Sequence, residues 1–452
     1  MLVIGEILFA EGDGMVYYIE VMLDINFIRE NRDLVEAAIK NKSCKADLTK
    51  IIELDDGRRE LQQKIDELRR ERNEIAGKMK GGKPEKALVD RGKQIKVELM
   101  RLEDNLDGIT RDYLKELKAV PNVPCLGVPV GLSEDENVVE CMVGEPPKFD
   151  FEVKNHYEIG QARDWIDKER AAKVAGARFA YIKGDMVKLQ MAIINFVIDA
   201  LTDEEVLKEI CKKFDVKAST KPFVPVLPPY MIRTELYDAM DRLEPREDRY
   251  KIEGDELWLQ GSAEHVLGSM YADEVFAEKD LPIRYLGYAT SFRQEAGTYG
   301  KDMEGIIRMH QFDKLEMESF TTSDESMEEH KLMVAVQRWL VEKLELPYRV
   351  LKKCTFDIGK PNACGIDIEV WLPGQGKYRE THTADYMTDY QARRLNTRVK
   401  RAGGMEFVHT NDATAFALGR IMIAIIENYQ TEDMKVRVPE VLKQYLGGKE
   451  ML

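Results

Sequence analysis

The residues best suited to chemistry lie in one segment, 291–320, which brings together arginines, carboxylates and an aromatic ring. Arg293 and Glu295 are two positions apart, so a strand would project both side chains from one face. Three glycines follow, and a second strand is expected from Ile306. Alternate residues of that strand would also share a face, and they are Arg308, His310, Phe312, Lys314, Glu316 and Glu318.

A β-hairpin with these side chains is poorly suited to a core, because isolated buried charges are costly. It suits a ligand with an aromatic ring and a polyphosphate. Arginine offers a planar fork for phosphate oxygens, Phe312 offers a stacking face, and carboxylates can hold Mg²⁺ or an amine. A salt-bridged sheet face is the alternative. The sequence contains neither GxxxxGK[ST] nor GxGxxG after a strand, so the two commonest nucleotide-binding motifs are absent.

The elements that would position these residues belong to a mixed α+β body that begins near residue 151. Strands are expected at Tyr285–Phe292 and Ile306–Phe320. Apolar periodicity predicts helices at Val187–Leu201, Met327–Leu344 and Ala415–Tyr429. Because the strands are separated by irregular lengths, without regular βαβ spacing, we expect an antiparallel sheet flanked by helices.

Residues 45–118 predict a helical hairpin. Apolar positions recur in steps of three and four on both sides of Gly81–Pro84, which is the heptad pattern of a coiled coil. A short Gly/Pro turn between two such helices folds them back on each other in antiparallel fashion. At 1.5 Å per residue each helix would be about 45–50 Å long. We therefore expect an arm that projects from the body.

The far end of this arm is basic, although the whole chain has 67 Lys and Arg against 82 Asp and Glu and a net charge of −15. Between Arg69 and Arg101 eleven basic residues stand against five acidic ones, a net charge of +6. An acidic protein repels nucleic acid, so a basic island on an arm indicates contact with RNA phosphates. A solvated coiled-coil surface is the alternative. The candidate residues are Arg69, Arg70, Arg72, Lys78, Lys80, Lys83 and Lys86.

The rest of the chain limits the class of protein. No stretch reaches the roughly 18 apolar residues of a membrane helix. Residues 1–21 lack a basic start, so they are not a secretory signal and are expected to be an extension or a misassigned start. Six cysteines without a CxxC pair indicate reduced thiols of a cytoplasmic protein and disfavour a structural zinc site. Prolines indicate a linker at 119–150, so the expected domains are 1–21, 22–118, 119–150 and 151–452.

The order Arg293-x-Glu295, glycine-rich loop, Arg308-x-His310-Gln311-Phe312-x-Lys314-x-Glu316 resembles motif 2 of class II aminoacyl-tRNA synthetases in their seryl form. The run 417–430 is similar to their motif 3 helix, and 378–380 with 389–394 is similar to the intervening segment. Residues 225–229 resemble motif 1, which forms the dimer interface in this family; a proline-rich bend before a strand is the alternative. The hairpin resembles the family's tRNA-binding arm, so the likeness covers roughly residues 22–445.

The resemblance implies a class II catalytic domain that uses ATP and Mg²⁺, without zinc, to join L-serine to the 3′-hydroxyl of tRNA(Ser) through a seryl-adenylate. It also implies a cytoplasmic homodimer. The implied catalytic residues are Arg293, Glu316, Glu380 and Arg420, and Glu380 is the implied ligand of the Mg²⁺ that accompanies ATP. The implied ATP site is Arg293, Gln294, Glu295, Met309, His310, Gln311, Phe312, Glu380, Thr381, His382, Thr383 and Arg420. The implied serine site is Ser262, Ala263, Glu264, Arg293, Glu316, Asp412 and Thr414.

Three segments around the amino-acid pocket depart from the family pattern. Residues 411–415 stand where the family usually reads Leu-Asn-Gly-Ser-Gly, so Asp412 replaces an amide and Thr414 stands for the hydroxyl that contacts serine. Residues 381–385 stand for Ser-Ser-Cys-Ser-Asn, and residues 238–243 stand for Gly-Thr-Gly-Gln-Leu-Pro. The extra carboxylates would favour a substrate ammonium group, so serine stays the expected substrate.

Other interpretations remain open on sequence alone. A ligase for a carrier protein or for another small amino acid shares the chemistry, although the arm disfavours the carrier and the lack of a zinc-ligand set disfavours threonine. An inactive RNA-binding relative has no need to retain all four implied catalytic residues. His382 is either a pocket ligand or a polar wall residue, and Cys354 and Cys364 are expected to be packed thiols.

Overall fold

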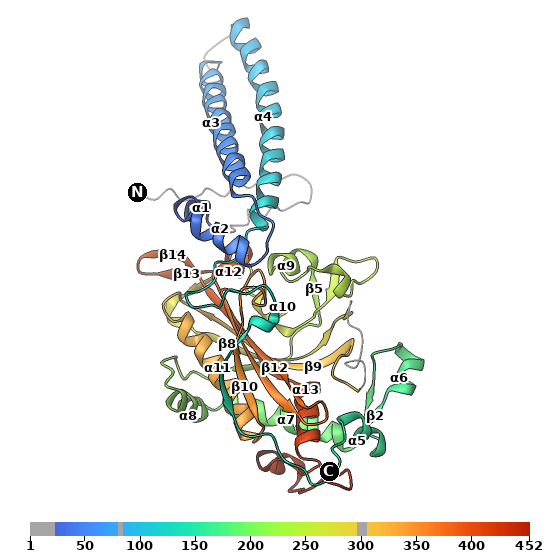
Figure 1. Ribbon diagram of the computed structural model, residues 1–452. Helices are drawn as coiled ribbons and strands as arrows, with labels where there is room; N and C mark the ends of the chain where they lie inside the picture. Colours follow the sequence, from blue (N-terminus) through green and yellow to red (C-terminus); the bar gives the residue numbers. More distant parts are fainter. Residues whose placement is uncertain (1–22, 80–84, 296–304) are drawn as a thin grey trace.

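The arm and the body are distinct parts of the molecule in Figure 1. The computed structural model describes residues 23–79, 85–295 and 305–452. Two long helices project from a small helical base, and the body holds one large sheet with helices on both of its faces. The candidate chemistry of motif 2 lies in the body, at a distance from the basic end of the arm.

The arm is an antiparallel pair of helices, α3 (Leu48–Met79) and α4 (Lys86–Lys118). Their 32 and 33 residues correspond to about 50 Å each at 1.5 Å per residue. Steps of three and four keep apolar residues on the facing sides of the helices. The seam buries Ile65, Ile75, Ile95 and Leu99. The predicted helical hairpin is confirmed, and the turn expected at residues 81–84 lies outside the described residues.

Two short helices, α1 (Ile25–Glu30) and α2 (Arg32–Asn41), form the base of the arm. Asp55 of α3 is fully buried there, and Arg29 of α1 pairs with its carboxylate at 3.0 Å. A buried carboxylate is stable only when it is paired, so this contact fixes the base against the arm. Lys42 follows α2 and donates a hydrogen bond to the carbonyl of Asn362 at 2.6 Å, which joins the base to the body.

The body is built on an eight-stranded sheet in the order β1-β10-β11-β12-β15-β9-β8-β4. Its strands are β1 (Val138–Val143), β4 (Val224–Val226), β8 (Ile283–Phe292), β9 (Gln311–Thr321), β10 (Tyr348–Lys352), β11 (Cys364–Leu372), β12 (Lys377–Thr388) and β15 (His409–Ala417). All neighbouring pairs are antiparallel except β4 and β8. The predicted antiparallel α+β body is therefore confirmed.

The two faces of the sheet carry different chemistry. The main hydrophobic core lies on one face and includes Leu315 and Met317 of β9. Three helices cover that face, namely α7 (Asp185–Leu201), α11 (Ser326–Lys343) and α13 (Leu418–Asn428). Because side chains alternate along a strand, Lys314, Glu316 and Glu318 point to the opposite face, where α10 (Ala263–Gly268) packs on β8 and β9. The charged motif thus lies beneath a short helix rather than in the apolar core.

Smaller elements surround the sheet. The remaining helices are α5 (His156–Ala162), α6 (Lys168–Ala175), α8 (Glu204–Phe214), α9 (Thr234–Ala239) and α12 (Tyr390–Leu395). The remaining strands are β2 (Ile166–Asp167), β3 (Tyr181–Ile182), β5 (Met231–Arg233), β6 (Leu257–Leu259), β7 (Val275–Ala277), β13 (Arg398–Arg401) and β14 (Gly404–Phe407). Among the described residues, no helix combines the length and apolar character needed to cross a bilayer.

Several predicted boundaries were wrong. Strand β8 ends at Phe292, so Arg293 and Glu295 follow the strand instead of sharing one of its faces, and Glu295 has a left-handed φ of 50°. Strand β9 begins at Gln311 because residues 305–310 form turns and bends, so Arg308 and His310 are not on the strand. Helix α13 begins only at Leu418, since residues 415–417 complete β15. The stretch expected to be a linker contains β1, an edge strand of the sheet.

Candidate active site

A cleft lies between the turn 305–309, strands β9, β12 and β15, and the start of α13. Arg293 lines it from the end of β8, and Arg420 lines it from α13. The other lining residues are Glu295, Ile306, Ile307, Arg308, Met309, Phe312, Lys314, Glu380, Thr381, Thr383, Thr414, Ala417 and Gly419. The two guanidinium groups that were predicted to act together therefore face a single cleft.

Arg293 is held in a defined orientation. Its Nε donates a hydrogen bond to the carbonyl of Gly261 at 3.0 Å. Its guanidinium carbon lies 5.4 Å from the centre of the Phe312 ring, a cation–π contact. With Nε used in this way, the two terminal nitrogens can form a bidentate contact with an anion such as phosphate.

Arg420 is paired with Glu380 across the cleft. Its Nη1 donates to the Glu380 carbonyl at 2.7 Å and lies 3.2 Å from the carboxylate oxygen Oε1. Desolvation by itself would raise the pKa of Glu380, but Arg420, Lys353 and Arg293 together lower that pKa to about 2. The Glu380 carboxylate is therefore ionised at neutral pH, next to a cation that can bind phosphate.

The turn that forms one wall of the cleft is supported from behind by His156, which the sequence analysis missed. This buried histidine accepts a hydrogen bond from the backbone N–H of Ile306 at 3.3 Å through Nε2, and its Nδ1 lies 2.8 Å from Glu427. Gly305 has a φ of 68°, and a Cβ at this position would lie 1.9 Å from His156 Nε2. Only glycine allows this close approach.

Four residues that the resemblance assigns to ATP do not line this cleft. Gln294 and His310 bond to nearby backbone carbonyls at 3.4 and 3.0 Å. Gln311 lines a neighbouring hollow together with Phe312. His382 is buried, its ring centre lies 5.2 Å from that of Phe416, and burial lowers its pKa to about 3. Because it is buried and its pKa is low, His382 is a neutral residue in the wall of the site.

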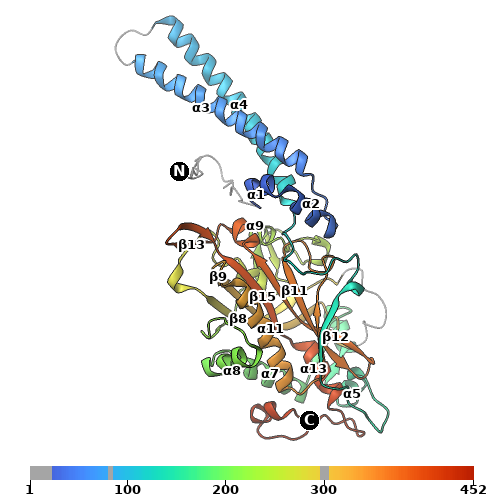
Figure 2. The same ribbon diagram turned by 60° about the vertical axis from the view of Figure 1, so that its left-hand side comes forward.

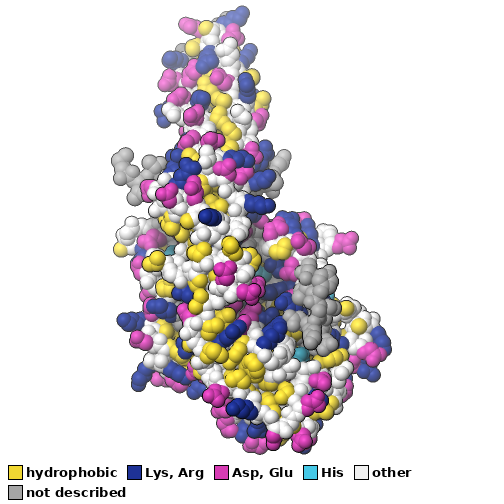
Figure 3. All heavy atoms as spheres, in the orientation of Figure 1, with side chains coloured by type: hydrophobic (Ala, Val, Ile, Leu, Met, Phe, Trp, Pro, Cys, Tyr) yellow, Lys and Arg dark blue, Asp and Glu magenta, His cyan; other side chains and the backbone are white. Residues whose placement is uncertain are grey.

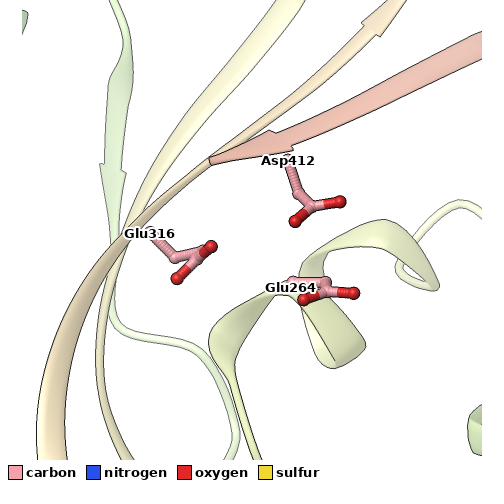
Figure 4. Close-up of side chains that lie close together, drawn as sticks. All are labelled: Glu264, Glu316 and Asp412. Atoms are coloured by element: carbon pink, nitrogen blue, oxygen red, sulfur yellow. The ribbon is translucent and has the colours of Figure 1, made fainter. Parts of the chain in front are cut away.

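A buried cluster of carboxylates, called the acidic pocket below, lies next to the cleft, and Lys314 contacts both. Lys314 lines the cleft, forms an ion pair with Glu316 and donates to the hydroxyl of Ser262 at 3.2 Å. Figure 4 shows the carboxylates of Glu264, Glu316 and Asp412 close together on α10, β9 and β15. One oxygen of each lies within 4.8 Å of the others, and all three residues are buried.

The protonation of these carboxylates is uneven. Burial raises the pKa of Glu316 to about 7, because Lys314 offsets only part of the cost. Burial and the surrounding carboxylates raise the pKa values of Asp412 and Glu318 well above the ordinary range. Burial would also raise the pKa of Glu264, but Arg242 together with the neighbouring His265 and Lys314 holds that pKa at about 2.

Within the described part of the chain, Glu316 Oε1 and both carboxylate oxygens of Glu318 lack hydrogen-bond donors, whereas Glu316 Oε2 contacts Lys314. Unmet acceptors of this kind are costly when buried. The pocket is therefore suited to a ligand group that brings N–H donors and positive charge, as an α-ammonium group does.

Of the residues that the resemblance assigns to serine, Thr414 lies at the cleft, whereas Ala263 is packed between α10 and the sheet. Thr414 lines the cleft and lies opposite Glu316 in the register of β15 and β9. Ala263 is fully buried and packs beneath Gly287, where an added Cβ would lie 3.2 Å from the Ala263 Cβ. Its role is close packing of α10 on the sheet. Arg242 reaches the pocket from the loop after α9. It lies in the segment 238–243 that departs from the family pattern, but the resemblance assigned it no role.

The basic residues of the arm lie on its surface. Arg70, Arg72, Lys78 and Lys86 are exposed, and Arg69 pairs with Glu103 of α4 at 2.9 Å. Lys80 and Lys83 lie outside the described residues. Figure 3 shows basic and acidic side chains interspersed along the arm, with Lys and Arg present at its far end. Exposed cations at this end can reach a partner far from the cleft.

Comparison with known proteins gives a family match for the arm and another for the body. Residues 22–124 match the model of the seryl-tRNA synthetase N-terminal domain, and residues 248–429 match that of the class II tRNA synthetase core domain (G, H, P, S and T). The serine–tRNA ligase of Nitrosopumilus maritimus is 38% identical over 436 residues, which cover 95% of this chain and all of that protein.

Solved structures agree with the sequence matches. The seryl-tRNA synthetase of Pyrococcus horikoshii, complexed with ATP, has a TM-score of 0.84 and 36% identity, covering 95% of this chain and 99% of that one. The cytoplasmic serine–tRNA ligase of Naegleria fowleri, in complex with AMP, has a TM-score of 0.80 and 28% identity, covering 95% and 98%. With its two arginines in one cleft, its acidic inner pocket and its helical arm, this chain belongs to the serine–tRNA ligase family of class II aminoacyl-tRNA synthetases.

Proposed function

We propose that the protein joins L-serine to the 3′-hydroxyl of tRNA(Ser) through a seryl-adenylate, releasing AMP and pyrophosphate. The observation that carries this proposal is that Arg293 and Arg420 face one cleft, and that Lys314, which lines the same cleft, contacts a buried cluster of carboxylates. A triphosphate requires cations, and an amino acid requires a carboxylate for its ammonium group. The cleft offers both next to each other.

In the first step the serine carboxylate attacks the α-phosphate of ATP. Arg293 contacts the α-phosphate and Arg420 the γ-phosphate, so both guanidinium groups stabilise the anionic transition state from fixed positions. Phe312 provides a stacking face for adenine, with Glu295, Met309 and their neighbours around it. No side chain needs to act as a strong base, because the attacking carboxylate is already ionised.

The residues present are compatible with Mg²⁺ beside the phosphates. Glu380 lines the cleft next to Arg420, and its low pKa keeps it ionised, as an oxygen ligand of Mg²⁺ must be. Bound there, Mg²⁺ would add positive charge to the triphosphate. Thr381 and Thr383 lie on the same strand as Glu380 and line the same wall.

Serine occupies the boundary between the cleft and the acidic pocket. Glu264 and Glu316 receive its ammonium group, the carboxyl group of Asp412 lies beside them, and Thr414 and Ser262 supply hydroxyl groups nearby. The raised pKa of Glu316 supports this assignment, because a substrate ammonium group would favour its ionised form. Glu316 Oε1 also lacks a donor within the described chain, and an ammonium group could supply one.

In the second step the tRNA 3′-hydroxyl attacks the adenylate carbonyl. The arm contacts the tRNA backbone through Arg69, Arg70, Arg72, Lys78, Lys80, Lys83 and Lys86, and its length separates this contact from the cleft. We place the protein in the cytoplasm as a homodimer. Exposed apolar side chains at Val224, Leu227, Tyr230 and Met231, around β4 and β5, support a partner at this edge of the sheet.

The proposal is tested by ATP–pyrophosphate exchange screened across all twenty amino acids, followed by charging of tRNA(Ser). Exchange that depends on serine, together with charging, is expected. Exchange that depends on a different amino acid would overturn serine as the substrate, and exchange without tRNA charging would point to a carrier-protein ligase.

A further inference from the structure

The three segments that depart from the family pattern meet at one guanidinium group. Arg242 comes from residues 238–243, Asp385 from residues 381–385 and Asp412 from residues 411–415. The Nη2 atom of Arg242 lies 3.9 Å from a carboxylate oxygen of Asp385 and 3.9 Å from one of Asp412. Segments separated by up to 170 positions in the sequence are therefore one cluster in space.

Strand pairing in the sheet brings the carboxyl groups of this cluster together. Asp385 of β12 lies directly opposite Asp412 of β15, which lies directly opposite Glu318 of β9. Three buried carboxylates thus form a row across three neighbouring strands. Like charges in such cross-strand positions would destabilise a sheet, and burial adds to that cost, so the pKa values of all three carboxyl groups are raised. Arg242 and Lys353, which lies 3.9 Å from Asp385, are the cations that reach this row among the described residues.

Arg242 also holds the pocket carboxylate Glu264. Its Nε forms an ion pair with Glu264, and its Nη2 donates to the side-chain oxygen of Asn362 at 3.3 Å. Its own backbone carbonyl accepts a hydrogen bond from Arg249 Nε at 3.1 Å. Asn362 and Arg249 thus hold Arg242 in place, and the ion pair with Arg242 in turn holds the Glu264 carboxylate, which faces Glu316 and Asp412.

We propose that Arg242, Asp385 and Asp412 form one charge-balanced unit that positions the Glu264 carboxylate for the ammonium group of the amino-acid substrate. Arg242 is a positioning residue, since it acts through Glu264. The unit deepens the proposed function and rests on it for the identity of the substrate. Arg242 pairs directly with Glu264 and lies beside both aspartates, so removing it would take the nearest shared cation from all three carboxyl groups.

The test uses the full chain with three variants. Arg242→Gln removes the cation, and the triple variant R242Q/D385N/D412N removes the cation together with its two aspartates. Arg401→Gln is the matched control, because Arg401 also pairs with three carboxylates, those of Asp324, Glu278 and Glu406, and does not line the cleft. Melting temperature, KM for serine, KM for ATP and kcat of serine-dependent exchange are measured for each.

Arg242→Gln is expected to lower the melting temperature more than Arg401→Gln, and the triple variant is expected to recover it. The folded triple variant should still show KM for serine raised by about tenfold or more, because Glu264 has lost a charged partner, with KM for ATP unchanged. A triple variant with wild-type KM for serine overturns the positioning role. A melting temperature that D385N and D412N do not restore overturns the charge-balanced unit. Absence of serine-dependent exchange in the wild type would refute the proposed function instead, and the melting temperatures would still decide whether the unit exists.

Discussion

Replacing Arg293 tests the central reasoning about the cleft. The Nε atom of Arg293 is bonded to Gly261, so its two terminal nitrogens are the donors available to the α-phosphate. A hydrogen bond to a charged group contributes about 1.5–3 kcal/mol. Two such bonds in the transition state correspond to about 3–6 kcal/mol, and since about 1.4 kcal/mol is a factor of ten in rate, Arg293→Ala should slow adenylate formation by about 10²–10⁴-fold.

Arg293→Lys separates charge from geometry. Lysine keeps the positive charge but cannot bond to Gly261 and present a fork at the same time. We expect the loss of about one charged hydrogen bond, or roughly 10–100-fold in rate. Both variants are assayed by serine-dependent ATP–pyrophosphate exchange at saturating substrates, with thermal melting to verify that they are folded.

Arg170→Ala serves as the control, because the Arg170 side chain is 73% exposed and does not line the cleft. Its exchange rate should match that of the wild type. A folded Arg293→Ala protein with exchange within tenfold of the wild type would refute the phosphate role. A lysine variant as active as the wild type would show that charge alone is sufficient and that the anchored fork is not needed.

Five further outcomes are expected. Shortening the arm by removing residues 62–105, which leaves the basal cluster around Ile51 and Tyr113 in place, should spare exchange but abolish tRNA charging; retained charging would dismiss the arm. Lys78→Ala and Lys86→Ala should each reduce the slope of log K for tRNA against log salt by about 1, and an unchanged slope would exclude phosphate contact. Serine binding should release protons near pH 6.5, because the pKa of Glu316 is raised to about 7 and an ammonium ligand favours the ionised form; calorimetric heats that do not depend on the buffer would contradict this. The same raised pKa makes stability depend on pH. Protonated Glu316 favours the folded state below its ordinary pKa of 4.5, and this contribution is lost as the pH rises through about 7. The difference in unfolding free energy between wild type and Glu316→Gln, measured by denaturant titration, should therefore change across that range. Leu227→Glu should convert a dimer to monomers in light scattering, whereas an unchanged mass would place the interface elsewhere.

Long periodic elements were predicted well from the sequence because their signals are local. Steps of three and four indicated α3 and α4, and Phe312 to Glu318 alternated as β9 requires. Boundaries failed where local pattern was overridden by tertiary contacts. Arg308 and His310 continue the alternation, yet the turn that holds them is fixed by His156 and Gly305, more than 140 positions apart.

The candidate site shows the same division. Arg293, Glu380 and Arg420 stood out because a motif surrounds each of them, and the structure brings all three to one cleft. Arg242 is in no motif, and Gln294, His310, Gln311 and His382 lie in motifs without lining the cleft. A residue type and its spacing indicate which chemistry is possible, whereas burial and neighbours decide which side chains are in a position to perform it.

By itself the sequence determined the arm, the antiparallel body and the pair of arginines, because each depends on periodicity or on residues close together in the chain. Only the tertiary structure decided the character of the amino-acid pocket. Strand register places Asp385, Asp412 and Glu318 in one row, and a loop from elsewhere delivers Arg242 to that row. Electrostatic energy depends on distances of a few ångströms between charges, and such distances between remote segments exist only once the chain has folded.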